Sequence, residues 1–179
     1  MKKSRSMLFK YQRVSQLREP RRIGIDTNVL IELIDNTYRS SYYSEPILRH
    51  GGFVHRISLE RKNTEAVKYF VEKRGLSLDD AWNRINDFCK KNNIKIVERD
   101  YDNKELLNSL LTTCKDESIP MHPPDCFIVA DFKKAGINTL YSTDETMKKA
   151  ARLLDMDTPN IPTVHKTIER DIRKLFKRK

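Results

Sequence analysis

The chain has 179 residues, of which 38% are hydrophobic and 34% are charged. A chain of this length forms one domain with a proper core and has little room for a second. No apolar run approaches the length of a membrane span, and residues 1–5 lack the apolar stretch of a secretion signal. We therefore expect a soluble, cytoplasmic protein with no membrane partner.

The net charge of +10 is concentrated at the two ends of the chain. Residues 1–22 carry +7 and residues 164–179 carry +5, which leaves −2 for the remainder. Basic ends on a nearly neutral body are typical of a protein that grips a polyanion, although a highly charged surface that serves solubility gives the same composition. We favour contact with nucleic acid, and the candidate contact residues are Arg21, Arg22, Lys174 and Lys177.

The spacing of apolar residues predicts strands and helices in alternation. Strands are expected at residues 23–25, 53–58, 93–98 and 137–142, with a last edge strand at 160–164. Helices are expected at residues 7–17, 63–73, 76–91, 103–114, 125–135, 145–154 and 166–176, and a further helix begins at Asn28. Residues 36–52 are polar and broken by Pro46, so they stay unassigned. This alternation favours an αβα sandwich around a mostly parallel sheet.

The elements divide the chain into a basic N-terminal extension at residues 1–22, one domain at residues 23–164 and a basic C-terminal helix or tail at residues 165–179.

Within the domain, two neighbouring helices carry apolar residues at helical spacing, which we expect to face the core. These residues are Ala66, Val67, Phe70 and Val71 in one helix and Leu78, Ala81, Trp82, Ile85 and Phe88 in the next.

Asp26 is the first candidate site residue. It follows the short apolar strand at residues 23–25 and precedes a helix. Ligand sites of open α/β folds lie at the carboxyl ends of their strands, and a buried carboxylate there is costly unless a cation or hydrogen-bond donors compensate it. The alternative is that Asp26 caps the helix that follows, since Asp is a favoured N-cap residue. Both interpretations are open on this segment alone.

Two more aspartates occupy matching positions far down the chain. Asp125 starts a predicted helix, and Asp144 ends a predicted strand beside Thr143. Each alone is explained by helix capping. Three carboxylates at corresponding ends are better explained by a shared cation, because close like charges are otherwise unfavourable. We expect Asp26, Asp125 and Asp144 to converge at one edge of the sheet.

These segments, in this order, resemble the PIN-domain nucleases, a family that includes VapC-like toxin ribonucleases. The resemblance covers about residues 23–164 and rests on four matches: Asp26-Thr27-Asn28 after a strand, Ser58 followed by Glu65 on a helix, Asp125-Cys126-Phe127-Ile128-Val129-Ala130 opening a helix, and Thr143-Asp144 after a strand. The family pattern implies a PIN-like sandwich and metal-dependent hydrolysis of phosphodiester bonds, usually in RNA.

The resemblance also implies roles for the matching residues. Asp26 and Asp125 are expected to hold a first Mg²⁺ or Mn²⁺, Asp144 to serve a second metal or position water, and Glu65 to orient water. Hard divalent cations prefer such carboxylate oxygens, and one bound metal lowers the pKa of an attacking water. Two residues are expected to hold the carboxylates from behind: Asn28 and Thr143.

Several points stay open at this stage. Glu60 competes with Glu65 as the helix acid, and Asp131 stands where the family often has a small residue, so it faces either solvent or the site. His122 precedes Asp125 and is either an ordinary loop histidine or a substrate contact. The expected partners are RNA, an antitoxin protein if the chain is a toxin, and a second copy of the chain, because PIN proteins are often dimers.

The biological role of such a nuclease is either that of a toxin in a toxin–antitoxin pair or that of an RNA-processing enzyme. Two other functions compete with it. A PIN-like module that binds RNA without cleaving it would commonly lack one or more of the acids. A phosphatase of the haloacid-dehalogenase type needs a second acid two residues after the first, where this chain has Asn28.

Overall fold

The structure is a computed structural model, and it describes residues 21–37, 40–41, 43–59 and 65–161. The helices predicted at residues 7–17 and 166–176 lie outside these residues, as do Glu60, Lys174 and Lys177. Within the described residues, every helix is too short or too polar to span a membrane.

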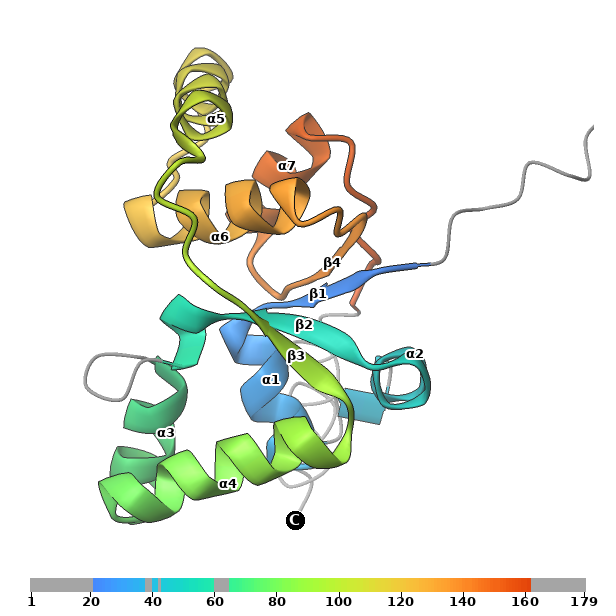
Figure 1. Cartoon of the computed structure of the whole chain (residues 1–179), viewed down its shortest axis with the longest axis vertical. Helices are drawn as coiled ribbons and strands as arrows, with labels where there is room; N and C mark the ends of the chain where they lie inside the picture. Colours follow the sequence, from blue (N-terminus) through green and yellow to red (C-terminus); the bar gives the residue numbers. More distant parts are fainter. Residues whose placement is uncertain (1–20, 38–39, 42, 60–64, 162–179) are drawn as a thin grey trace, which may run out of the picture.

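Four parallel strands form the central sheet, in the order β3-β2-β1-β4 (Figure 1). The strands are β1 (Ile23–Ile25), β2 (Gly52–His55), β3 (Ile94–Val97) and β4 (Thr139–Tyr141). In the register of the sheet, Ile25 lies between Val54 of β2 and Tyr141 of β4. The edge strand expected at residues 160–164 falls mostly outside the described residues, and a single parallel bridge joins Thr139 to Asp157 instead.

Helices cover both faces of the sheet, which confirms the predicted αβα sandwich (Figure 1). One face carries α1 (Thr27–Ile34), α2 (Ser44–His50), α3 (Glu65–Arg74) and α4 (Leu78–Lys91). The other carries α5 (Lys104–Asp116), α6 (Pro123–Lys134) and α7 (Glu145–Leu153). Helix α2 arises in the segment that the sequence left unassigned, where Pro46 is tolerated because it stands in the first turn of the helix.

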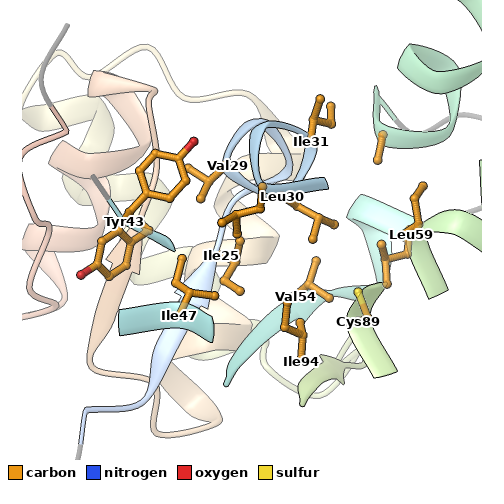
Figure 2. Close-up of a cluster of buried hydrophobic side chains, with 14 of the residues drawn as sticks. Ile25, Val29, Leu30, Ile31, Tyr43, Ile47, Val54, Leu59, Cys89 and Ile94 are labelled. Atoms are coloured by element: carbon orange, nitrogen blue, oxygen red, sulfur yellow. The ribbon is translucent and has the colours of Figure 1, made fainter. Parts of the chain in front are cut away.

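A separate apolar cluster fills each face. Figure 2 shows the first cluster, in which Ile25, Val54 and Ile94 of three strands pack with Leu30 of α1 and Cys89 of α4. Burial of such side chains contributes roughly 1.5–3 kcal/mol each to stability. The second cluster joins β4 to α5, α6 and α7.

Two details of the core depend on local geometry. Leu78, expected in the core, is 52% exposed because it is the first residue of α4, while Ala81 and Ile85 further along are buried as predicted. Gly24 of β1 faces α6, and a Cβ atom there would lie 2.8 Å from the ring of Phe132. The absence of a side chain at Gly24 therefore lets α6 lie close against the sheet.

Candidate active site

The candidate site lies where two neighbouring strands send the chain to opposite faces of the sheet. Strand β1 leads into α1 on one face, whereas β4 leads into α7 on the other (Figure 1). Such a topological switch point leaves a crevice at the carboxyl ends of the strands, which is the usual ligand position in open α/β sheets. Asp26 follows β1 directly, and Ser142 and Asp144 follow β4.

A pocket of about 410 Å³ opens at this point. Asp26, Asp125 and Asp144 all line it, and they come from the starts of α1, α6 and α7. The structure thus brings together three of the four acids that the sequence singled out. Glu65 begins α3, but its side chain lies outside the described part of the chain.

Asp26 is buried, with only 7% of its surface exposed. Its Oδ1 accepts a hydrogen bond from the Thr27 backbone N at 2.7 Å, and its Oδ2 accepts one from Ser142 Oγ at 2.7 Å. Burial raises the pKa of Asp26 from 3.8 to about 6, and the Asp125 and Asp144 carboxylates add smaller increases. Asp125 and Asp144 are therefore both close enough to Asp26 to disfavour its charged form.

Asp144 is exposed and caps α7. Its Oδ1 accepts hydrogen bonds from the backbone N of Thr146 at 2.6 Å and of Met147 at 3.1 Å. Both bonds end on one oxygen of the carboxylate. Capping and membership of the pocket, which the sequence presented as alternatives, therefore coexist at Asp144, and Asp26 also combines them as the N-cap of α1.

The remaining predicted residues divide between the pocket and other positions. Asn28 and His122 line the pocket, and both are exposed. Thr143 is half-buried, and the hydroxyl that reaches Asp26 belongs to its neighbour Ser142. The adjacent Ser-Thr pair carried a signal for a supporting hydroxyl, but only the structure shows which of the two points to Asp26.

Arg21 and Arg22 lie at the opposite, amino end of β1. The Arg22 guanidinium stacks 5.0 Å above the ring of Phe53, and its backbone N donates to Asn138 Oδ1. The three residues of β1 lie between Arg22 and Asp26, so four residue steps separate the two Cα atoms, about 13 Å at the usual rise of a strand. The structure does not bring these arginines to the pocket.

The other wall of the pocket is the 3-10 helix η2 (Arg56–Leu59), which follows β2. Ile57 and Ser58 line the pocket from this helix. The buried Ser58 Oγ accepts a hydrogen bond from Thr27 Oγ1 at 2.8 Å. Because Thr27 also donates its backbone N to Asp26, the helix η2 is linked to the buried carboxylate through one residue.

A second buried carboxylate, Asp131, lies behind this wall and is only 2% exposed. It accepts hydrogen bonds from Arg99 Nη1 at 2.7 Å, Asn103 Nδ2 at 2.9 Å and the Asp100 backbone N at 3.2 Å, and it contacts His55 Nε2 at 3.0 Å. Of the two orientations that the sequence allowed, the solvent-facing one is therefore wrong.

The hydrogen bonds of Asp131 determine its ionisation. Burial alone would raise the pKa of its carboxyl group, but the bonds from Asn103, Arg99 and His55 lower the pKa below its ordinary value. Asp131 is therefore a charged and fully compensated carboxylate, in contrast to Asp26.

Comparison of the sequence with protein-family models and with curated proteins finds no match. The fold does match solved structures. VapBC2 from Rickettsia felis bound to a DNA fragment from their promoter matches with a TM-score of 0.58 and 13% identity, over 78% of this chain and 98% of that one. DNA-bound VapBC from Salmonella typhimurium matches with a TM-score of 0.58 and 10% identity, over 80% of this chain and 100% of that one.

A third structure, FitAB bound to an IR36 DNA fragment, matches with a TM-score of 0.54 and 15% identity, over 77% of this chain and 94% of that one. All three complexes contain subunits of the PIN type. The chain has the PIN fold. The likeness at these identities concerns the fold, and the resemblance inferred from the four sequence segments is confirmed at that level.

The donor chemistry of the pocket in this PIN fold fits a hydrated divalent cation. Among the described residues, no three Asp, Glu, His or Cys side chains form a group that could hold a metal ion on their own. Mg²⁺, however, commonly binds through one or two carboxylates and keeps several waters. Asp26 and Asp125 in a shared pocket match that requirement, and the raised pKa of Asp26 shows a carboxylate that a cation would stabilise.

Because several buried donors depend on the Asp131 carboxylate, we expect the protein to lose much stability when that carboxylate is removed. Asp131→Ala leaves the buried groups of Arg99, His55 and Asn103 without their acceptor, so we expect the free energy of unfolding to fall by about 3–5 kcal/mol. Urea denaturation followed by circular dichroism measures this change. The exposed Asp116→Ala serves as the control and should change stability by less than about 0.5 kcal/mol. A loss below about 1 kcal/mol in Asp131→Ala would contradict the assignment.

For Asp26 we expect the opposite effect, namely that removing its negative charge increases stability at neutral pH. Its pKa is raised on folding, so the folded state binds the proton more tightly, and the contribution of Asp26 to stability falls as the pH rises from about 4 to about 6 and then levels off. The penalty at pH 7.5 is on the order of 3 kcal/mol. Asp26→Asn in EDTA should therefore be more stable than wild type at pH 7.5, with a difference that shrinks toward pH 4. Denaturant titrations at several pH values test this, and a variant less stable at every pH would refute it.

Proposed function

We propose that the chain is a divalent-metal-dependent endoribonuclease that hydrolyses phosphodiester bonds of RNA. The observation that carries this proposal is the shared pocket of Asp26, Asp125 and Asp144 at the switch point of a PIN fold. A buried carboxylate with a raised pKa beside two further acids is unfavourable without a positive ligand. A divalent metal ion, bound together with the phosphate of the bond to be cleaved, would supply that positive charge.

In this proposal Asp26 and Asp125 hold a first Mg²⁺ or Mn²⁺, and Asp144 holds a second ion or positions water. An ion held there would lower the pKa of a bound water and would stabilise the charge that develops on the phosphate. Ser142 and the Thr27 backbone N each donate to one oxygen of Asp26, and these hydrogen bonds hold the carboxylate in its orientation toward the pocket. Glu65 orients the water, while Asn28, which lines the same pocket, supports the carboxylates.

The reaction consumes one water for each bond cleaved. The water oxygen forms a bond to phosphorus, one P–O ester bond breaks, and the leaving oxygen takes up a proton. The protein contributes by holding the reacting groups in line, because little of the barrier requires covalent chemistry by side chains.

The biological role that we favour is that of a toxin held inactive by an antitoxin. The structural neighbours support this choice, because VapBC and FitAB are two-component complexes and each is bound to DNA. Processing of cellular RNA is the second role, and the basic ends of the chain favour it. A homodimer stays a prediction in either case.

Cleavage assays test the activity. Wild-type protein should cut labelled single-stranded and structured RNAs with Mg²⁺ or Mn²⁺ and not with EDTA. Asp125→Asn should reduce the rate by at least about 100-fold, because it removes one ligand charge while Asn keeps the size of the side chain. Asp116→Asn, an exposed acid at the end of α5, is the matched control and should cut normally. RNA binding without cleavage under every metal would favour the non-catalytic module instead.

Expression in a bacterial host separates the two roles. A free toxin should arrest growth within a few generations of induction, and the arrest should depend on Asp125 because it requires RNA cleavage. Asp125→Asn at an equal protein level should therefore restore growth, whereas Asp116→Asn should not. Active nuclease that leaves growth unaffected would contradict the toxin role and favour RNA processing.

A further inference from the structure

A line of hydrogen bonds and short stretches of backbone connects the buried Asp131 to the candidate site through His55. Asp131 Oδ2 lies 3.0 Å from His55 Nε2, and His55 Nδ1 lies 3.1 Å from the Ile57 backbone N. Ile57 and Ser58 belong to η2, and Ser58 accepts from Thr27, which in turn donates to Asp26. The line thus runs from one buried carboxylate to the other.

The two contacts of the His55 ring determine which of its nitrogens carries the proton. The Ile57 backbone N–H is a donor, so His55 Nδ1 must be the unprotonated nitrogen, and the ring proton resides on Nε2 and is donated to Asp131. Burial lowers the pKa of His55, consistent with a neutral ring. The ring is fully buried and packs edge-on against Phe132, with 6.0 Å between ring centroids.

The location of the acceptor explains why a polar ring is buried here. The first N–H groups of any helix lack partners within the helix, and in η2 the Ile57 N–H is one of them. An apolar side chain at position 55 would fill the same space without accepting this bond. Replacing a buried polar pair by apolar groups is often neutral or favourable for stability, so stability alone does not account for His55.

Asp131 holds the ring in the orientation that directs Nδ1 at Ile57. Its carboxylate is itself held by Arg99, Asn103 and the Asp100 backbone, which follow β3, while His55 ends β2. A ring rotated by 180° would lose both hydrogen bonds at once. The position of η2 therefore depends on the residues that follow β3, through Asp131 and His55.

We propose that His55 is a positioning residue of the candidate site: its Nδ1 holds the Ile57 amide and thereby sets the wall of the pocket that carries Ser58 to Thr27 and Asp26. This inference rests on the proposed nuclease function for its catalytic consequence, while its structural part is independent of it. Residues that orient a metal site from behind commonly change activity by 10- to 100-fold when altered.

Two substitutions separate the two hydrogen bonds of His55. The amide oxygen of Asn occupies the place of Nδ1, so His55→Asn keeps the acceptor for Ile57 and loses the donor to Asp131. The amide nitrogen of Gln occupies the place of Nε2, so His55→Gln keeps the donor to Asp131 and loses the acceptor for Ile57. Each variant is the control for the other.

The experiment compares both variants with wild type in three measurements. They are the melting temperature, the amide exchange of Ile57 and Ser58 by NMR, and kcat on a labelled single-stranded RNA well below either melting temperature. We expect His55→Gln to exchange at least tenfold faster at Ile57 and to lose 10- to 100-fold in kcat. His55→Asn should keep exchange and kcat within about threefold while being the less stable of the two.

The proposal predicts that the less stable variant, His55→Asn, is the more active one, and this reversal is what the experiment tests. If kcat and exchange follow stability, with His55→Asn worse in all three measurements, His55 serves the core only and the proposal is overturned. Equal effects of both substitutions would overturn it as well. Ser58→Ala provides a second route should either variant unfold, because it breaks the same line one step later and should reduce kcat by a similar factor.

The outcome also distinguishes this inference from the proposed nuclease function. Wild-type protein that cleaves no RNA, combined with fast Ile57 exchange only in His55→Gln, would refute the nuclease function and leave the positioning of η2 by His55 in place. Wild-type protein that cleaves RNA, with kcat unchanged in both variants, would refute the positioning role and leave the nuclease function in place.

Discussion

The interaction on which the rest of the structure depends is the buried carboxylate of Asp131. It joins the end of β2, the segment after β3 and helix α6 at a single point, through His55, Arg99 and Asn103. Removing charges from water is costly, and such a cluster is tolerable only because every oxygen of the carboxylate has donors. The cluster gives the carboxyl edge of the sheet a fixed frame, and the pocket is built on that frame.

Asp26 and Asp131 show two ways of burying the same chemical group. Hydrogen bonds outweigh burial at Asp131 and lower its pKa, whereas burial outweighs them at Asp26 and raises its pKa to about 6. The donors around Asp131 therefore outweigh its burial, whereas the two hydrogen bonds of Asp26 only partly offset its burial. A buried carboxylate with a raised pKa that lines a pocket beside two further acids is a candidate ligand-site residue.

Much of the fold and three of the site acids could be predicted from sequence because they depend on local patterns. Alternating apolar strands and helices specify the parallel sheet, and strand-end aspartates such as Asp26 then meet at one edge. The partners of Asp131 could not be predicted, because His55, Arg99 and Asn103 are distant in sequence and meet only through tertiary packing. The choice of Ser142 over Thr143 likewise depends on side-chain direction. Leu78 was misplaced because a helical stripe does not show where the buried part of a helix begins.

Helix α6 is fastened at two successive residues, since Asp131 is held by the polar cluster and Phe132 packs on the bare backbone of Gly24. Asp125 lies earlier on the same helix, so these attachments help to fix the backbone that carries its side chain to the pocket. An inhibitor of this protein would gain little from trying to distort the site, because the distortion would cost the energy of that double attachment. A molecule that blocks this pocket would therefore do so more readily by covering its opening than by shifting helix α6.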